Sequence, residues 1–367
     1  MKPLVGPYIQ TLKPYVPGKP IETLKRERGI EGEVAKLASN ENPLGTSPLA
    51  VEAARAALSE GHLYPDGAAF DLRKRLASHL DVSIDRIVTA NGSNELIELI
   101  VRTFTRPGDH AVVSEHSFIV YRIVMQSMNV SFEVAPARDP MTHDLRAMAE
   151  AVTDKTKLVF IANPNNPTGT HNSEDELRAM LDKLAAMPDP PLVVMDEAYY
   201  EYADANDYPD SIEFSAVYPR LLSLRTFSKC YGMAAFRVGD AVCSPEIAGY
   251  LHTVRAPFNV SRISQKAAIA ALDDTDFLAE TVKMNKSERE RVAEALRPLM
   301  KKILPSQTNF LLCETPCPGA VLYDRLLDRG IIIRPLAGYQ LPNHVRISIG
   351  LPHQNDRLIE AVAEVLS

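Results

Sequence analysis

The sequence has no tryptophan, only four cysteines and no long apolar run. A membrane-spanning helix needs about 20 consecutive apolar residues, and no segment approaches that length. The opening residues, MKPLVGP, hold no apolar core of the kind that signal peptides carry. Basic residues are outnumbered, 40 against 47 acidic ones, and the net charge is −7. This balance disfavours a general nucleic-acid binder, although a basic patch can hide within an acidic total. We therefore predict a cytoplasmic protein without nucleic-acid or membrane partners.

The four cysteines show no metal or disulfide pattern. Cys230, Cys243, Cys313 and Cys317 are irregularly spaced, and the closest pair is not C-x-x-C. No H-E-x-x-H helix accompanies them. A chain of 367 residues has enough core to fold without disulfides. We expect four reduced thiols, mostly in the core, and no metal site.

Short apolar runs alternate with helical patterns from about residue 48. The expected strands cover 86–90, 111–113, 131–134, 158–162, 192–195 and 221–224, and the expected helices 48–59, 70–80, 94–104, 118–128 and 173–187. Runs with little polar alternation predict strands buried on both faces. The alternation predicts an α/β fold around a mostly parallel sheet flanked by helices. After about residue 262, a long helical pattern at 276–300 and shorter elements predict a smaller α+β unit.

The first ~40 residues are rich in proline and cannot form one continuous helix. They predict an extended arm with a short helix near 21–28, lying either on a neighbouring subunit or on its own domain. We divide the chain into an arm with part of the small domain (1–45), a large domain (46–260) and a small C-terminal domain (261–367).

Polar residues follow the ends of the expected strands, where parallel sheets bind ligands. The helix start at Gly92 and Ser93 suits an anion, because its N–H groups are free, but taken alone the local evidence favours Ser93 as an ordinary helix cap. Neither a G-x-x-x-x-G-K-[ST] nor a G-x-G-x-x-G run is present. This argues against a Walker nucleotide site and a dinucleotide fold.

Three charged residues at later strand ends each allow two interpretations. Asp196 follows a buried strand and fits an ion pair or helix cap, or a partner for a positive ring nitrogen or a metal. Lys229 fits a solvated lysine or a Schiff-base lysine with a lowered pKa. Arg237 fits a surface ion pair or a phosphate ligand.

Together these residues resemble a known pattern. NPTG at 166–169, DEAY at 196–199 and SK at 228–229, followed by Arg237, look like the fold-type I pyridoxal phosphate enzymes, the aspartate aminotransferase superfamily. Within it, the chain resembles the histidinol-phosphate aminotransferase family from about residue 10 to the C-terminus. The matching stretches are LASNENPLG at 37–45, YPD at 64–66, NGSNELI at 91–97, HSFIVY at 116–121, RTFSK at 225–229, PFNV at 257–260, IRPLAGY at 333–339 and VRISIG at 345–350.

The resemblance implies roles around a pyridoxal 5'-phosphate ring. Lys229 would carry the cofactor as an internal aldimine, and its freed amine would move the proton between substrate and cofactor. Asp196 would keep the pyridinium nitrogen protonated, which makes the ring an electron sink. Asn166 and Tyr199 would hydrogen-bond the phenolic oxygen. Phe118 would stack on the ring face.

The resemblance also implies a phosphate site shared between two subunits. The residues implied to hold the cofactor phosphate are Gly92, Ser93, Asn94, Ser228 and Arg237, with Tyr64 reaching in from the partner subunit. The predicted assembly is therefore a homodimer with shared active sites. One departure from the family pattern stands here, because Ala235 and Phe236 precede Arg237 where the family usually has glycine and leucine.

The acidic end of the substrate would be held by Tyr15, Asn166, Arg334 and Arg346. Arginine suits this task because its planar fork binds carboxylate or phosphate in two places. Without the resemblance, surface ion pairs are the favoured interpretation of the two arginines. Arg346 stands within a short apolar strand, which otherwise excludes charge.

The predicted function is the transfer of an amino group between L-histidinol phosphate and 2-oxoglutarate in histidine biosynthesis, giving imidazole acetol phosphate and L-glutamate. An aromatic amino-acid aminotransferase and a pyridoxal phosphate-dependent decarboxylase of amino-acid phosphates remain as alternatives. A regulator built on the same fold normally carries an added DNA-binding domain, and the predicted domains use the whole chain.

Overall fold

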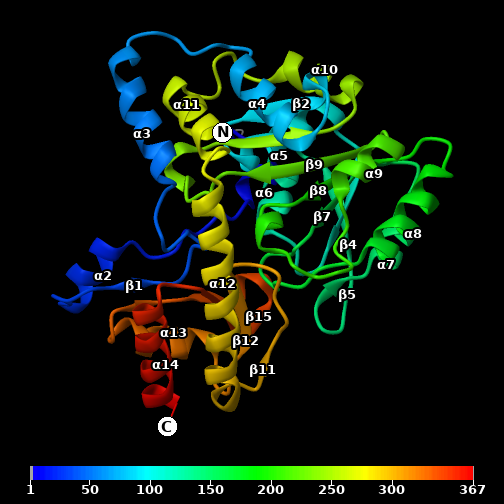
Figure 1. The fold of residues 1–367 in the computed structure, drawn as a ribbon. Helices are drawn as coiled ribbons and strands as arrows, with labels where there is room; N and C mark the ends of the chain where they lie inside the picture. Colours follow the sequence, from blue (N-terminus) through cyan, green and yellow to red (C-terminus); the bar gives the residue numbers. More distant parts are fainter. Residues whose placement is uncertain (1–2, 367) are drawn as a thin grey trace.

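The computed structural model describes residues 3–366 (Figure 1). Met1 and Lys2, which open the segment read for a signal peptide, lie outside the described residues, as does Ser367. A seven-stranded sheet forms the centre, with strand order β2-β10-β9-β8-β7-β3-β4. Its strands are β2 (Ile87–Ala90), β3 (His110–Ser114), β4 (Ser131–Ala135), β7 (Thr156–Ala162), β8 (Leu192–Asp196), β9 (Leu221–Thr226) and β10 (Gly239–Val242). Within the described chain, β10 is the strand that runs antiparallel to its neighbours, so the predicted mostly parallel sheet is confirmed.

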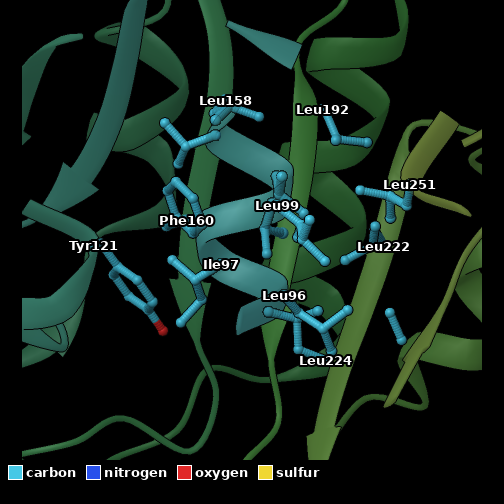
Figure 2. Packing of buried hydrophobic residues seen from close by; sticks show 14 of the residues in the cluster. Leu96, Ile97, Leu99, Tyr121, Leu158, Phe160, Leu192, Leu222, Leu224 and Leu251 are labelled. Carbon is cyan, nitrogen blue, oxygen red and sulfur yellow. The ribbon is translucent and has the colours of Figure 1, made fainter. Parts of the chain in front are cut away.

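Helices cover both faces of this sheet (Figure 1). One face packs against α5 (Ser93–Phe104), α6 (Ile119–Ser127) and α10 (Pro245–Val254), and Figure 2 shows side chains of α5 meeting those of the strands. The other face packs against α7 (Leu145–Glu150), α8 (Glu174–Ala185) and α9 (Ser211–Val217). In β7, Phe160 points into the first core and Ile161 into the second. Successive strand residues point to opposite faces, which explains why these strands are apolar throughout.

A third core lies beside β2. Here α3 (Pro48–Ala57) and α4 (Phe70–Leu80) pack with α11 (Arg262–Ala271), and Figure 1 shows α3 and α11 side by side. The predicted helices at 48–59 and 70–80 are therefore confirmed within a residue or two.

The second sheet belongs to the smaller unit and has the order β11-β12-β15-β14. Its strands are β11 (Lys302–Ile303), β12 (Phe310–Glu314), β14 (Arg334–Leu336) and β15 (Leu341–Ser348), covered by α12 (Thr275–Leu296), α13 (Gly319–Leu327) and α14 (Pro352–Leu366). Near the N-terminus, β1 (Ala35–Lys36) pairs in parallel with β13 (Ile331–Ile332). The segment before the large sheet thus joins the C-terminal unit, and it carries residues 38–40 to the boundary between the two sheets.

Smaller elements complete the described chain: α1 (Pro7–Gln10), α2 (Ile21–Arg28), β5 (Ala137–Arg138) and β6 (Thr142–His143). The short helix expected near 21–28 is confirmed, whereas α1, α7, α9, α10, α11 and β10 are among the elements that were not predicted. The β10 strand, GDAV, escapes a search for apolar runs because it begins with glycine and the buried Asp240. All four cysteines are free, and Cys317 is less buried than the other three. No helix among residues 3–366 is long and apolar enough to cross a membrane.

Candidate active site

A cavity of about 300 Å³ opens where the carboxyl ends of β7, β8 and β9 meet the second sheet. Most of the predicted site residues line it: Tyr15, Ser93, Asn94, Phe118, Asn166, Asp196, Tyr199, Ser228, Lys229, Arg237 and Arg346. They come from segments far apart in the sequence. The parallel strands bring them together because their carboxyl ends share one edge of the sheet.

Lys229 stands in the turn after β9, and its amine faces the cavity. Nζ lies 3.5 Å from the carbonyl oxygen of Ser39 and 5.6 Å from the centre of the Tyr199 ring. Burial, together with the positive charge of Arg346, lowers the pKa of Lys229 to about 8. This amine is therefore not an ordinary solvated lysine, because it is buried and loses its proton far more readily than an exposed lysine does.

Asp196 ends β8 with its carboxylate buried in the cavity wall. The Tyr121 hydroxyl donates a 2.6 Å hydrogen bond to Oδ2, and the backbone N–H of Ala198 donates to Oδ1 over 3.2 Å. Burial raises the pKa of Asp196, while these two hydrogen bonds and the Lys229 charge oppose that rise. Among residues 3–366, no ion pair neutralises this carboxylate, and no group of three acidic, His or Cys residues that could hold a metal is found.

Arg346 is buried, so it is not the surface ion pair that the sequence left open. Its Nη1 donates to Oδ1 of Asn166 over 2.6 Å, and its Nη2 donates to the carbonyl of Ala38 over 2.7 Å. Because Oδ1 of Asn166 is engaged in this way, its amide Nδ2 is the group left to donate to a ligand. Tyr199 accepts a 2.8 Å hydrogen bond from Nδ2 of Asn40.

The helix start after β2 forms an anion-binding cradle. The prediction that Ser93 caps α5 is wrong: Gly92 holds the cap position with a φ of 83°, and no side chain caps the helix. A Cβ at position 92 would lie 2.3 Å from Nη2 of Arg237, so only glycine lets the guanidinium approach. Arg237 also donates to Oγ of Ser228 over 3.3 Å. Uncapped helix N–H groups, a hydroxyl and a guanidinium therefore face one small space, which suits a phosphate.

The unusual residues before Arg237 leave this arginine in place. Ala234–Phe236 form a single 3-10 turn, and Arg237 adopts a φ of 56° after it. The Phe236 ring packs against the core formed by α3, α4 and α11. The extra aromatic volume is thus directed away from the phosphate cradle.

Three predicted residues do not line this cavity: Gly92, which lies behind Arg237 in the cradle, Tyr64 and Arg334. Tyr64 is 79% exposed and stacks on Phe258 with a ring separation of 4.8 Å. Arg334 donates to the carbonyl of Val16 over 2.6 Å, and its guanidinium lies 5.6 Å from the ring centre of Tyr15. Tyr15 itself lines the cavity, so Arg334 lies next to a residue of the cavity wall.

Residues 32–362 match the family described as aminotransferase class I and II. This chain belongs to that family. Curated relatives of the aminotransferase span its whole length: a histidinol-phosphate aminotransferase 2 of Pseudomonas fluorescens is 47% identical over 99% of this chain and 98% of its own. A protein of the same name from Pseudomonas aeruginosa is 45% identical with the same coverage.

Solved structures agree with the predicted fold of the aminotransferase. A histidinol-phosphate aminotransferase from Sinorhizobium meliloti, in complex with pyridoxal-5'-phosphate, superposes with a TM-score of 0.89 at 32% identity, covering 99% of this chain and 97% of that one. An aspartate aminotransferase from Thermus thermophilus, with maleate, gives 0.84 at 20% identity over 99% and 98% of the two chains. The predicted fold-type I architecture is confirmed.

Sequence reasoning missed two residues of the aminotransferase site, Asn40 and Tyr121. Both lie in stretches that matched the family pattern, LASNENPLG and HSFIVY, but neither had been given a role. Asn40 is 1% exposed and Tyr121 is fully buried. Their contacts with Tyr199 and Asp196 join residues that are far apart in the sequence, so only the fold reveals them.

Proposed function

We propose that this aminotransferase binds pyridoxal phosphate through Lys229. The observation that carries the proposal is one cavity that holds the Lys229 amine, the buried Asp196 carboxylate and the phosphate cradle of Ser228 and Arg237. These residues fit the group: the cradle takes an anion, the carboxylate takes a positive ring nitrogen, and the amine takes an aldehyde. The Sinorhizobium meliloti relative was solved in complex with pyridoxal-5'-phosphate, which supports the same cofactor for this chain.

When bound, pyridoxal phosphate supplies an aldehyde that takes up the amino group and a ring that accepts electrons from the substrate carbon. Asp196 holds the ring nitrogen in its protonated form. Asn166 and Tyr199 donate hydrogen bonds at the phenolic oxygen, and Phe118 covers one ring face. Lys229 Nζ, whose lowered pKa near 8 makes its neutral form accessible, takes the proton from the substrate carbon and returns it.

We further propose that the substrates are L-histidinol phosphate and 2-oxoglutarate, converted to imidazole acetol phosphate and L-glutamate. The names of the full-length relatives support this choice. The Arg346 fork is the buried cationic group for the acidic end of either substrate, and Arg334 lies beside Tyr15, which lines the cavity. A guanidinium donates two hydrogen bonds to a phosphate or to a carboxylate in the same geometry, which lets one site serve both half-reactions.

A substrate panel tests this function. The cofactor-loaded protein is mixed with histidinol phosphate, phenylalanine or an amino-acid phosphate, and conversion of the cofactor to its amino form is followed by absorbance. We expect histidinol phosphate to give the highest kcat/KM. A clear preference for phenylalanine would show an aromatic aminotransferase instead, and carbon dioxide release from the amino-acid phosphate would show a decarboxylase.

We also propose a cytoplasmic homodimer in which Tyr64 completes the phosphate site of the partner subunit. The exposed Tyr64 ring, stacked on Phe258 and absent from the cavity of its own chain, supports this arrangement. Four free thiols support a reducing compartment.

Mixing two defective variants tests the shared site. A Lys229→Ala subunit lacks the amine but keeps Tyr64, whereas a Tyr64→Ala subunit keeps the amine. A heterodimer of the two contains one site with both native residues, so activity should rise above that of either homodimer after subunit exchange. If each Tyr64 served its own chain, mixing would restore nothing.

A further inference from the structure

We propose that Asn40 and Ser348 are positioning residues that turn the hydroxyl proton of Tyr199 into the active-site cavity. This inference rests on the proposed function, because it concerns how Tyr199 meets the phenolic oxygen of pyridoxal phosphate. Three buried side chains carry it, exposed by 1% for Asn40, 3% for Ser348 and 3% for Tyr199.

The hydrogen bonds among these residues run in one direction. Oγ of Ser348 accepts the backbone N–H of Asn40 over 2.9 Å, so its own proton is free to go to Oδ1 of Asn40, 2.8 Å away. With Oδ1 engaged, the amide nitrogen of Asn40 faces Tyr199 and donates to Oη over 2.8 Å. Tyr199 therefore accepts from Asn40, and its single proton remains for a ligand in the cavity.

Asn40 is held rigidly enough to fix this direction. Its φ of 54° lies in the left-handed region, which asparagine tolerates better than most residues. Its carbonyl accepts a 3.1 Å hydrogen bond from Asn309, so backbone and side chain are both anchored. The Tyr199 ring is fixed in turn by an edge-to-face contact with Phe310 at 5.3 Å.

The three residues come from three parts of the fold. Asn40 follows β1, Ser348 ends β15 of the second sheet, and Tyr199 follows β8 of the large sheet. Arg346, two residues before Ser348, lies on the same face of β15 and donates to the carbonyl of Ala38. The Lys229 amine approaches the carbonyl of Ser39, between these two contacts.

Residues 38–40 therefore touch the substrate arginine, the lysine and the tyrosine in succession. Residues 37–40 hydrogen-bond to the small sheet, so they move with it. A shift of that sheet relative to the large sheet therefore changes the Asn40–Tyr199 and Arg346–Asn166 contacts together. The direction of the Tyr199 hydroxyl thus depends on the position of the small sheet. Through that hydroxyl, the position of the small sheet also affects the hydrogen bond to the phenolic oxygen of the cofactor.

The measurable consequence is the pH at which the cofactor changes colour. A hydroxyl that donates to the phenolic oxygen stabilises its deprotonated form, so it lowers the midpoint of the visible absorbance titration. Tyr199→Phe removes this donor and should raise the midpoint by about one pH unit, the size of a hydrogen bond to a charged group.

The test compares Asn40→Asp and Ser348→Ala in the wild-type and Tyr199→Phe backgrounds. In Asn40→Asp, the carboxylate accepts the Tyr199 proton, so the midpoint should rise by about one unit, as it does in Tyr199→Phe. In Ser348→Ala, Oδ1 of Asn40 loses its donor, so the side-chain amide can flip and present either its oxygen or its nitrogen to Tyr199. The midpoint should therefore rise by less than in Asn40→Asp. Neither substitution should add a further rise in the Tyr199→Phe background. Ser211→Ala is the matched control. This buried serine opens α9, its hydroxyl contacts Ser223 of β9, and its replacement should leave the midpoint unchanged.

Two results overturn the inference. One is a midpoint that does not move in either variant. The other is an equal rise in the Tyr199→Phe background, since this would show a long-range effect of charge and not an action through the hydroxyl. Thermal unfolding of the cofactor-free variants establishes that they fold, and if Asn40→Asp does not, the Ser348→Ala pair decides. A wild-type protein that takes up no pyridoxal phosphate would refute the proposed function instead.

Discussion

The Tyr121 hydroxyl donates a 2.6 Å hydrogen bond to Oδ2 of Asp196, and both side chains are buried. The Tyr121 ring stacks on Phe160 at 4.7 Å and meets Phe118 edge-on at 5.7 Å. One residue thus supports both the carboxylate proposed for the ring nitrogen and the aromatic ring proposed for the cofactor face. Figure 2 shows its ring within the core, with the hydroxyl oxygen at the outer end of the side chain.

Tyr121→Phe removes the hydroxyl and keeps the ring that packs in the core. The Asp196 carboxylate then loses a hydrogen bond that opposes the rise of its pKa, so it pairs less well with a positive nitrogen. We expect the Kd for pyridoxal phosphate to rise about tenfold, equivalent to about 1.4 kcal/mol. Titration of cofactor-free protein measures this. Tyr218→Phe, which removes a hydroxyl–carboxylate contact with Asp182 at the surface, should leave the Kd unchanged.

Gly92→Ala tests the phosphate cradle, and Gly108→Ala is its control. Both glycines have a positive φ, 83° and 98°, so both substitutions should lower the free energy of unfolding by about 1 kcal/mol. Only at position 92 does the new methyl group meet Arg237; position 108 has nothing within 4 Å. We expect the Kd for pyridoxal phosphate to rise at least tenfold in Gly92→Ala alone. Equal Kd values in the two variants would contradict the proposed cradle.

The lowered pKa of Lys229 predicts how cofactor capture depends on pH. Only a neutral amine attacks an aldehyde, so the rate of uptake by cofactor-free protein should rise with pH, with a midpoint near 8, and level off about one pH unit higher. Stopped-flow absorbance across a pH series measures the midpoint. Arg346→Gln removes a positive charge that helps to lower this pKa, so the midpoint should move upward. Arg346→Lys keeps the charge and should keep the midpoint near that of the wild type.

Arg334→Gln tests substrate choice. Arg334 lies beside Tyr15 of the cavity wall, where it suits the phosphate of an extended substrate. We expect KM for histidinol phosphate to rise about tenfold or more, in keeping with a lost charge-assisted hydrogen bond of about 1.5–3 kcal/mol, while KM for phenylalanine changes little. Arg297→Gln, at a surface pair with Glu294, is the control. Equal increases in KM for both substrates would show that Arg334 makes no specific contact with the substrate phosphate.

Much of the fold follows from local patterns in the sequence. Apolar runs such as 158–162 and 192–195 predicted buried parallel strands, and β7 and β8 contain them. The β10 strand was missed because a buried carboxylate interrupts its apolar pattern, and its place between β2 and β9 is set by pairing across the sheet. The cap of α5 was misplaced by one residue, because the positive φ of Gly92 and the closeness of Arg237 to it belong to the folded chain and leave no local signal in the sequence.

The chemistry-bearing residues Lys229, Asp196 and Arg237 were visible in the sequence by itself, because each follows a recognisable strand end in a family pattern. Their pKa values and hydrogen-bond partners could not be fixed from the sequence. Burial and the nearby Arg346 lower the Lys229 pKa, and Tyr121 and Asn40 fix the donors and acceptors at Asp196 and Tyr199. These effects depend on distances between segments that are remote in the chain. Spacing along the sequence therefore determined which groups take part. Only the packing of the two sheets against residues 38–40 decided the protonation of these groups and the directions of their hydrogen bonds.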